Sequence, residues 1–161
     1  NVCEQRPVVE MGAAALFIRR TDAPDWNNAF INFDYKGLFV APNYLVTKLW
    51  YDNFSRYRLS YTGETGSLSI STTLSENGKE VIVKIVNPTE NAFDLTINGD
   101  WKSLTGAGYE YIAPGSLTAE NSMDSPNAVS VEKKEVSVSD NTVSLDIAPL
   151  SVGVLRLTKG F

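Results

Sequence analysis

The sequence predicts a mainly β fold, an antiparallel β-sandwich (jelly-roll-like) preceded by a short α/β remnant of a (β/α)8 barrel. Apolar residues alternate with a period of two in several short runs between residues 68 and 157, as in half-buried strands. A single helical stripe follows Pro42, and residues that favour turns separate the alternating runs. We therefore expect residues 1–56 to form the last strand, loop and helix of the barrel, and residues 57–161 to form the sandwich.

The first part contains two short runs that are typical of strands. Ala13 to Ile18 has the length and apolar composition of a buried strand. A long loop rich in Asp, Asn, Pro and Gly extends from Thr21 to Pro42. It includes a second strand-like run, Ala29 to Phe33, which is followed by a turn at Asp34 to Gly37.

The clearest helix begins at Pro42 and Asn43. Its apolar stripe consists of Leu45, Val46, Leu49, Trp50 and Phe54. The order strand, loop, helix is the unit that a parallel α/β barrel repeats. We expect the earlier units to precede Asn1 in a longer parent. Without them, the apolar groups of this segment should cover the sandwich or one another, or form a homodimer interface.

The second part is predicted to form six strands, each with one buried and one exposed face. They are Leu68 to Thr72, Val81 to Val86, Phe93 to Ile97, Val136 to Val138, Val143 to Ile147 and Val152 to Leu157. Turn residues at Glu76 to Gly78, Asn98 to Asp100 and Asp140 to Asn141 separate or end them. The stretch Ala113 to Asn127 has no apolar period and predicts a long surface connection between the two sheets, or alternatively a binding loop.

Composition excludes several kinds of function. The formal net charge is −5 and no long Lys or Arg run occurs, so we expect no nucleic-acid partner. Apolar runs such as GAAALFI are too short to cross a membrane, and no membrane partner is expected. One cysteine and no histidine exclude disulfides within the chain, Ser-His-Asp and Cys-His catalysis, and His-ligated metals. We expect neither a metal nor a cofactor.

Three segments occur in a fixed order along the chain: WNNAFINFDYKGLFVAPNYLVTKLWYDNF, VIVKIVNPTE, and SPNAVS together with the ending IAPLSVGVLRL. Together they resemble the C-terminal part of glycoside hydrolase family 51, the α-L-arabinofuranosidases. That family has a final barrel helix of the type APNY-x-V-x-KLW, a strand ending in VNPT, an SPN-x-V segment and a closing PP-x-SV-x-VLRL strand. Here Ala148 and Pro149 replace the proline pair.

The resemblance implies a catalytic (β/α)8 barrel followed by a sandwich, and retaining hydrolysis of terminal α-L-arabinofuranosyl groups from arabinan, arabinoxylan and related hemicellulose. Such hydrolysis uses two carboxyl groups about 5 Å apart. In the family they are glutamates on barrel strands four and seven, and this chain begins after strand seven, so we expect no catalytic residue in it. Its implied partners are the barrel of the same parent, which the sandwich would brace, and an arabinose-containing polysaccharide or oligosaccharide.

Two alternatives remain open, a free-standing carbohydrate-binding module and a purely structural sandwich. The sequence does not fix the compartment of the parent, and a periplasmic or extracellular location is one option.

Residues on the long loop are candidates for contact with substrate. The carboxylates Asp22, Asp25 and Asp34 are better interpreted as turn and cap residues than as a catalytic pair. The resemblance places a second group, Trp26, Asn27 and Asn28, near the substrate of the parent. An indole can cover a sugar face and an amide can bind its hydroxyl groups, although loop packing is the alternative interpretation.

Aromatic residues of the second part offer another possible sugar contact. Trp101, Tyr109 and Tyr111 lie near predicted connecting loops, although positions in the core are the favoured alternative. We expect the aromatic stripe around the helix to pack against the sheet rather than to bind sugar. This stripe consists of Phe39, Tyr44, Trp50, Tyr51, Phe54, Tyr57 and Tyr61.

Overall fold

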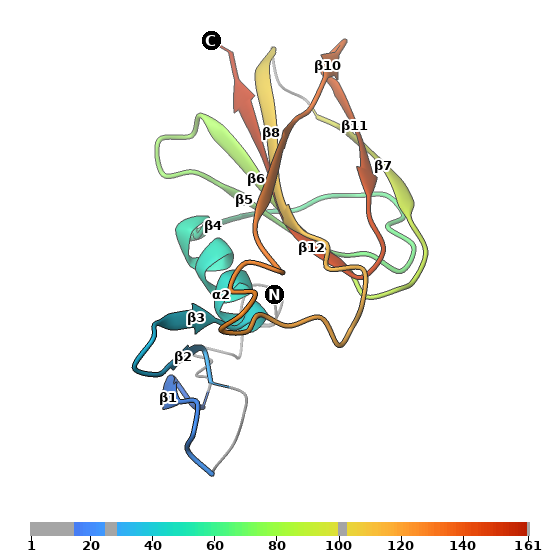
Figure 1. Cartoon of the computed structure of the whole chain (residues 1–161). Helices are drawn as coiled ribbons and strands as arrows, with labels where there is room; N and C mark the ends of the chain where they lie inside the picture. The colour runs from blue at the N-terminus through green and yellow to red at the C-terminus, as the bar shows by residue number, and fades with distance from the viewer. Residues whose placement is uncertain (1–14, 25–28, 100–102, 161) are drawn as a thin grey trace.

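The computed structural model describes residues 15–24, 29–99 and 103–160, and two antiparallel sheets face each other in it (Figure 1). The large sheet contains, in spatial order, β4 (Tyr57–Leu59), β5 (Ser69–Leu74), β6 (Glu80–Asn87), β12 (Ser151–Lys159), β8 (Leu104–Ile112) and β9 (Glu132–Glu135). The small sheet contains β10 (Val138–Ser139), β11 (Thr142–Ile147) and β7 (Phe93–Asn98). The predicted antiparallel sandwich is confirmed.

The core between the two sheets is built from residues at alternate strand positions. Val83 and Ile85 of β6 and Leu155 and Leu157 of β12 are fully buried there, against Leu145 of β11. The predicted exposed face is wrong for β6 and β12, whose other face is also buried. A helix covers that face, so these central strands are apolar on both sides.

The covering helix is α2 (Pro42–Asp52), which begins at the predicted residue with proline in its first turn. Leu49 is buried against Ile82 of β6 and Val154 of β12, and Leu45, Val46 and Trp50 pack around this second cluster. The apolar stripe therefore faces the sandwich as expected, except that Phe54 lies beyond the helix and is exposed. No helix in the described part of the chain has the length and hydropathy needed to cross a membrane.

Three short strands precede α2 and form a separate sheet in the order β1 (Ile18–Arg20), β2 (Ile31–Phe33) and β3 (Leu38–Val40). β1 and β2 are parallel, whereas β2 and β3 form a hairpin around the predicted turn, where Lys36 and Gly37 donate backbone N–H groups to Asp34 Oδ1. Of the predicted strand at 13–18, only Ile18 lies in a strand among the described residues, and it is exposed. The sequence did not predict β3.

The sequence also missed β4, β8 and β9. The strand β8 includes Thr105, Gly106 and Gly108, which weaken the apolar alternation, and β9 has the exposed sequence EKKE. Because β8 and β9 are neighbours in one sheet, the long connection after residue 112 returns to the sheet it left, and the predicted crossing between sheets is wrong. The boundary predicted between residues 56 and 57 stays a prediction.

Two predicted hairpins are confirmed with the backbone geometry that their sequences favour. Gly78 has a φ of 70° in the turn between β5 and β6. Asp140 and Asn141, with φ of 49° and 60°, both adopt the left-handed conformation of a two-residue turn between β10 and β11.

Candidate functional site

Several residues predicted to contact substrate lie outside the described part of the chain. They are Asp25, Trp26, Asn27, Asn28 and Trp101. Their roles stay predictions.

Tyr109 and Tyr111 of β8 are described, and both rings belong to the packing of the sandwich. Tyr109 is only 2% exposed, and its ring stacks on that of Tyr111 with 5.1 Å between centroids. Burial raises the pKa of the Tyr109 phenol above its ordinary value. Tyr111 is half-buried and donates its hydroxyl to Glu132 Oε2 at 2.7 Å, which raises its own pKa. Tyr109 therefore lies in the core of the sandwich, which was the favoured alternative, and sugar contact by Tyr109 and Tyr111 stays a prediction.

Of the loop carboxylates, Asp34 has the turn role that the sequence favoured, Asp22 forms an ion pair, and Asp25 lies outside the described residues. Arg20 donates from Nε and Nη2 to the two carboxylate oxygens of Asp22, at 2.5 and 2.7 Å. This hydrogen bonding lowers the pKa of Asp22, so the group stays ionised and is unsuited to donate a proton. Asp34 accepts the backbone N–H groups of its own turn. Among the described residues, no three acidic or cysteine side chains gather as metal ligands.

The distinctive arrangement of this chain is instead the contact between the segment from β3 to α2 and the sandwich. We call it the attachment surface. Three sandwich side chains, Lys84, Asn121 and Arg156, each bind an atom of that segment. None of the three was a candidate in the sequence.

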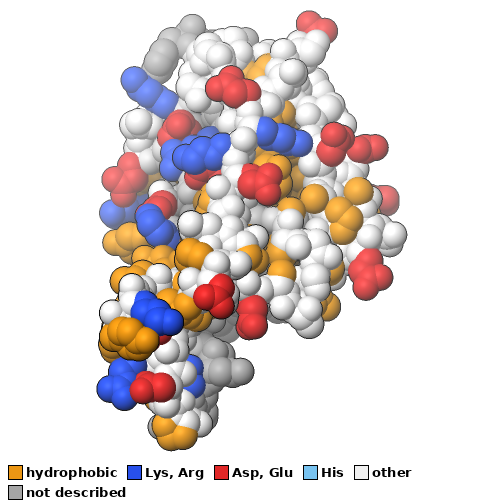
Figure 2. All heavy atoms as spheres, viewed as in Figure 1, with side chains coloured by type: hydrophobic (Ala, Val, Ile, Leu, Met, Phe, Trp, Pro, Cys, Tyr) orange, Lys and Arg blue, Asp and Glu red, His pale blue; other side chains and the backbone are white. Residues whose placement is uncertain are grey.

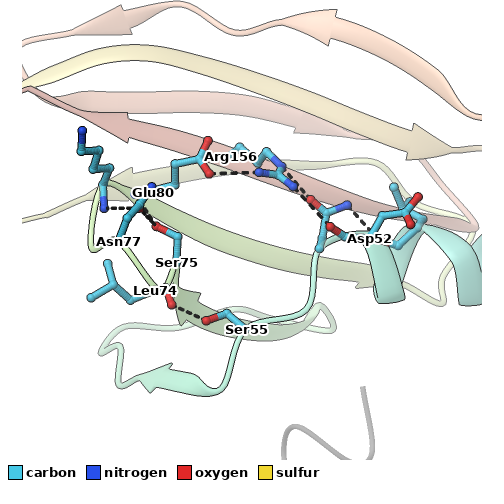
Figure 3. A network of polar contacts seen from close by, with 10 residues as sticks. Asp52, Ser55, Leu74, Ser75, Asn77, Glu80 and Arg156 are labelled. Carbon is cyan, nitrogen blue, oxygen red and sulfur yellow. Dashed lines mark hydrogen bonds and ion pairs between the residues drawn. The ribbon is translucent and has the colours of Figure 1, made fainter.

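Arg156 of β12 holds the end of α2 (Figure 3). Its Nε donates to Asn53 Oδ1 at 2.7 Å, one Nη donates to Glu80 Oε2 at 3.0 Å, and the other lies 3.4 Å from the Asp52 carbonyl oxygen. Asn53 is itself buried, and its amide donates to the Leu49 carbonyl at 2.8 Å. The guanidinium group thus satisfies polar atoms at the helix C-terminus, where carbonyl groups lack partners within the helix.

Lys84 lies under the same helix and is fully buried. Its ammonium group donates to the Trp50 carbonyl oxygen at 3.2 Å and lies 5.7 Å from the centroid of the indole ring. Such a cation–π contact adds to the hydrogen bond when the cation is shielded from water. Lys84 is the lysine of the run VIVKIV, and its side chain lies on the face of β6 that α2 covers.

Asn121 attaches the long connection to β3. Its amide donates to the Val40 and Val129 carbonyl groups at 2.9 and 3.0 Å, and its oxygen accepts the Val129 N–H at 2.7 Å. Asn121 is 3% exposed, and its two bonds to Val129 are buried, whereas the bond to Val40 is partly buried. Nothing in the aperiodic sequence around residue 121 signals this role.

Apolar side chains gather over β1 to β3 and remain uncovered (Figure 2). The exposed ones in and beside this sheet are Phe17, Ile18, Phe33, Tyr35 and Leu38. We call this group the apolar sheet surface. One expectation from the sequence was that the apolar groups of the first segment cover the sandwich. Leu45, Leu49 and Trp50 do so, whereas Phe17 and Ile18 are exposed. Exposed apolar patches of this kind mark contact sites in proteins.

No protein-family model matches the sequence, and no curated protein matches it significantly. Solved structures share its fold. An arabinose-bound family 51 α-L-arabinofuranosidase, MgGH51, matches 91% of this chain with a TM-score of 0.80 and 21% identity, over 24% of its own length. The corresponding enzyme of Thermotoga petrophila RKU-1 matches 80% of this chain with a TM-score of 0.68 and 19% identity, over 31% of its own length.

The chain has the fold of the sandwich-like C-terminal domain of family 51 structures, and it spans between 24% and 31% of the length of these neighbours. A family 30 xylanase C from Talaromyces cellulolyticus also matches, with a TM-score of 0.57 and 14% identity over 81% of this chain and 27% of its own. The fold therefore occurs with more than one activity, and the activity has to be argued from the site.

Proposed function

We propose that this chain is the C-terminal part of a family 51 α-L-arabinofuranosidase and that its sandwich braces the last strand, loop and helix of the catalytic barrel. The attachment surface is the observation that carries this proposal. Lys84, Asn121 and Arg156 bind three successive points of the segment, Val40, Trp50 and the residues that end α2. Three separated attachments fix both the position and the orientation of that segment.

The segment needs such support because it buries little by itself. The strands β1 to β3 contain three residues each, and only Ala29, Phe30 and Leu49 are buried hydrophobic residues between positions 29 and 54. A sheet this small is not stable alone. We place the preceding barrel strands of the same parent against the apolar sheet surface, where the parallel pair β1 and β2 already has the arrangement of a parallel barrel.

Retaining hydrolysis requires two carboxyl groups about 5 Å apart, and the described loop carboxylates are engaged in an ion pair and a turn. We therefore place the catalytic pair in the parent, outside this chain. The proposed substrates of the parent are terminal α-L-arabinofuranosyl groups of arabinan or arabinoxylan. The isolated chain is expected to be inactive.

Two measurements test this proposal. The codons that precede Asn1 in the gene should encode earlier strand and helix units that carry two glutamates at the ends of strands. An in-frame stop codon directly before Asn1 would contradict it. The purified 161-residue chain should not hydrolyse 4-nitrophenyl α-L-arabinofuranoside, and turnover that copurifies with the chain would show that it contains its own catalytic pair.

In the isolated chain, the apolar sheet surface is proposed to form a homodimer interface instead. Sedimentation velocity should show a dimer that Ile18→Asp dissociates. Leu117→Asp is the matched control, because Leu117 is also exposed but lies on the long connection between β8 and β9. A monomeric wild-type chain would contradict the dimer and leave the bracing role untouched.

A further inference from the structure

The two sheets of the sandwich differ in width, and this leaves a cleft between them. Three strands face six, and β7 is an edge strand whose neighbour on one side is β11. The connection from β4 to β5 extends toward β7 and returns (Figure 1), and its residues 61–65 share a lining with Ile70 and Thr72 of β5. A cleft of about 400 Å³ lies between β5, β7 and residues 61–65 of this connection. We call it the inter-sheet cleft.

The connection approaches β7 at Gly66, whereas its residues 61–64 are exposed to solvent. Gly66 has a φ of 56°, and a Cβ atom at this position would lie 3.4 Å from the ring of Phe93. Gly63, with a φ of 116°, allows the chain to turn back over the cleft. The volume is within the range of small-molecule binding sites.

The chemistry of the lining restricts the ligand. The floor is apolar and includes Ile70 and Leu95, whereas the rim carries the hydroxyl groups of Tyr61 and of several threonines. Glu64 is the ionisable carboxyl group of the lining, and the lining contains neither lysine nor arginine. A phosphate or a uronic acid would therefore find no opposite charge there. A neutral ligand with apolar C–H faces and many hydroxyl groups fits both kinds of lining.

The Tyr61 side chain has a group ready to bind such a ligand. Tyr61 is 48% exposed, and its hydroxyl lies 3.4 Å from the Ile70 carbonyl oxygen, a long contact that leaves its oxygen able to accept. Asn98 accepts a hydrogen bond from Thr142 Oγ1 at 2.7 Å, which fixes the orientation of its amide. That amide lies with Thr142 on the face of the small sheet opposite to Leu95, so it does not point into the cleft.

We propose that the inter-sheet cleft binds a short neutral saccharide, with the Tyr61 ring against a sugar face and the threonine hydroxyl groups of the rim on sugar hydroxyls. The lining residues alone support this binding, so it does not depend on the enzyme family of the parent. It also gives a sugar-binding role to a part of the sandwich that the attachment surface does not use.

Amide chemical shifts of the ¹⁵N-labelled 161-residue chain test the proposal. The titrants are α-1,5-L-arabinotriose, xylotriose and, as an anionic control, inorganic phosphate. One trisaccharide should shift the amides of residues 61–65 and 95–98, with a dissociation constant of about 1 mM, and phosphate should not. The absence of shifts at about 20 mM of either trisaccharide, or shifts confined to other residues, would overturn the proposal.

Substitutions separate binding in the cleft from nonspecific contact. Tyr61→Ala should weaken binding about fivefold, the effect of losing one ring contact. Tyr57→Ala is the matched control, because Tyr57 is 51% exposed but does not line the cleft. Equal affinity in all variants would show that the cleft is not a sugar site. The same would follow if the backbone amides of β7 were hydrogen-bonded to a strand of another copy of the chain.

Discussion

Arg156 of β12 donates its Nε hydrogen to Asn53 Oδ1 at 2.7 Å, and this bond joins residues 103 positions apart in sequence. The same guanidinium group binds Glu80 of β6, so one side chain connects two strands of the large sheet to the end of α2. The attachment of the helix therefore includes a directional contact in addition to apolar packing.

Arg156→Met should lower the free energy of unfolding by about 1 to 3 kcal/mol, because the partly buried acceptors that it satisfies lose their donor. Urea unfolding at pH 7 measures this change. Arg56→Met is the control, since Arg56 pairs with Glu76 on an exposed surface, where an ion pair contributes about 0.5 kcal/mol or less. Equal losses in the two variants would contradict a special role for Arg156.

Gly153 of β12 gives room to the buried ring of Tyr109. A Cβ atom at residue 153 would lie 2.3 Å from the Tyr109 hydroxyl oxygen, far inside contact distance. Gly153→Ala should therefore destabilise the protein by about 1 to 3 kcal/mol, as overpacked cores do. Gly108→Ala on the neighbouring strand is the control, because a Cβ there meets nothing within 4 Å. Thermal unfolding compares the two, and an unchanged melting temperature for Gly153→Ala would show that the ring can move.

Asn121→Ala should release the long connection from β3. Two buried hydrogen bonds and one partly buried bond are lost, and the Val129 N–H group is left without an acceptor, so we expect a loss of about 2 to 4 kcal/mol. Hydrogen exchange should show that the Val129 amide is protected in the wild type and exchanges rapidly in the variant. Asn91→Ala is the control, since the hydrogen bonds of Asn91 use its backbone atoms. Retained protection of Val129 would contradict the role of Asn121.

Stability should fall in alkaline solution because of Tyr109. Burial raises the pKa of its phenol, so the folded state keeps the proton that the unfolded chain releases near pH 10. The contribution is complete below about pH 10 and is lost as the pH rises further, by up to about 1.4 kcal/mol per pH unit. Urea unfolding between pH 7 and 11 measures this slope.

Tyr109→Phe should reduce that slope without removing it, because the pKa of Tyr111 is also raised. At pH 7 the same variant should be at least as stable as the wild type, since the buried Tyr109 hydroxyl has no hydrogen-bond partner among the described residues. Tyr35→Phe, at a position almost fully exposed, is the control and should keep the wild-type slope. An identical slope in Tyr109→Phe would exclude Tyr109 as the titrating group.

Local sequence predicted the elements whose pattern depends on their own residues. The helix after Pro42, the strands β7 and β11 and the turn at Asp140 and Asn141 are where the sequence placed them, whereas the strand predicted at Val136 to Val138 is β10 at Val138–Ser139. Period, proline and turn chemistry act over a few residues, so they are readable without the rest of the fold. The strand β8 was missed because its glycines interrupt the period, and pairing with β12 forms it.

The aromatic residues show where local pattern fails. The stripe expected to pack around the helix is divided, with Trp50 against the sandwich and Tyr51, Phe54, Tyr57 and Tyr61 exposed. Tyr109, a candidate for sugar contact, is in the core. An aromatic residue has the same local preference whether it is buried or exposed. Its burial depends on whether a sheet face packs against it in the tertiary structure.

The sequence by itself determined the period of each clear element, the turns between them and the resemblance to a sugar-cleaving family, because these depend on residue types at short spacing. Only the tertiary structure decided that Lys84, Asn121 and Arg156 meet the segment from β3 to α2. These contacts join residues between 34 and 104 positions apart. Their partners are mostly backbone carbonyl groups, which every residue carries, so the contacts leave no mark in the sequence of the partner.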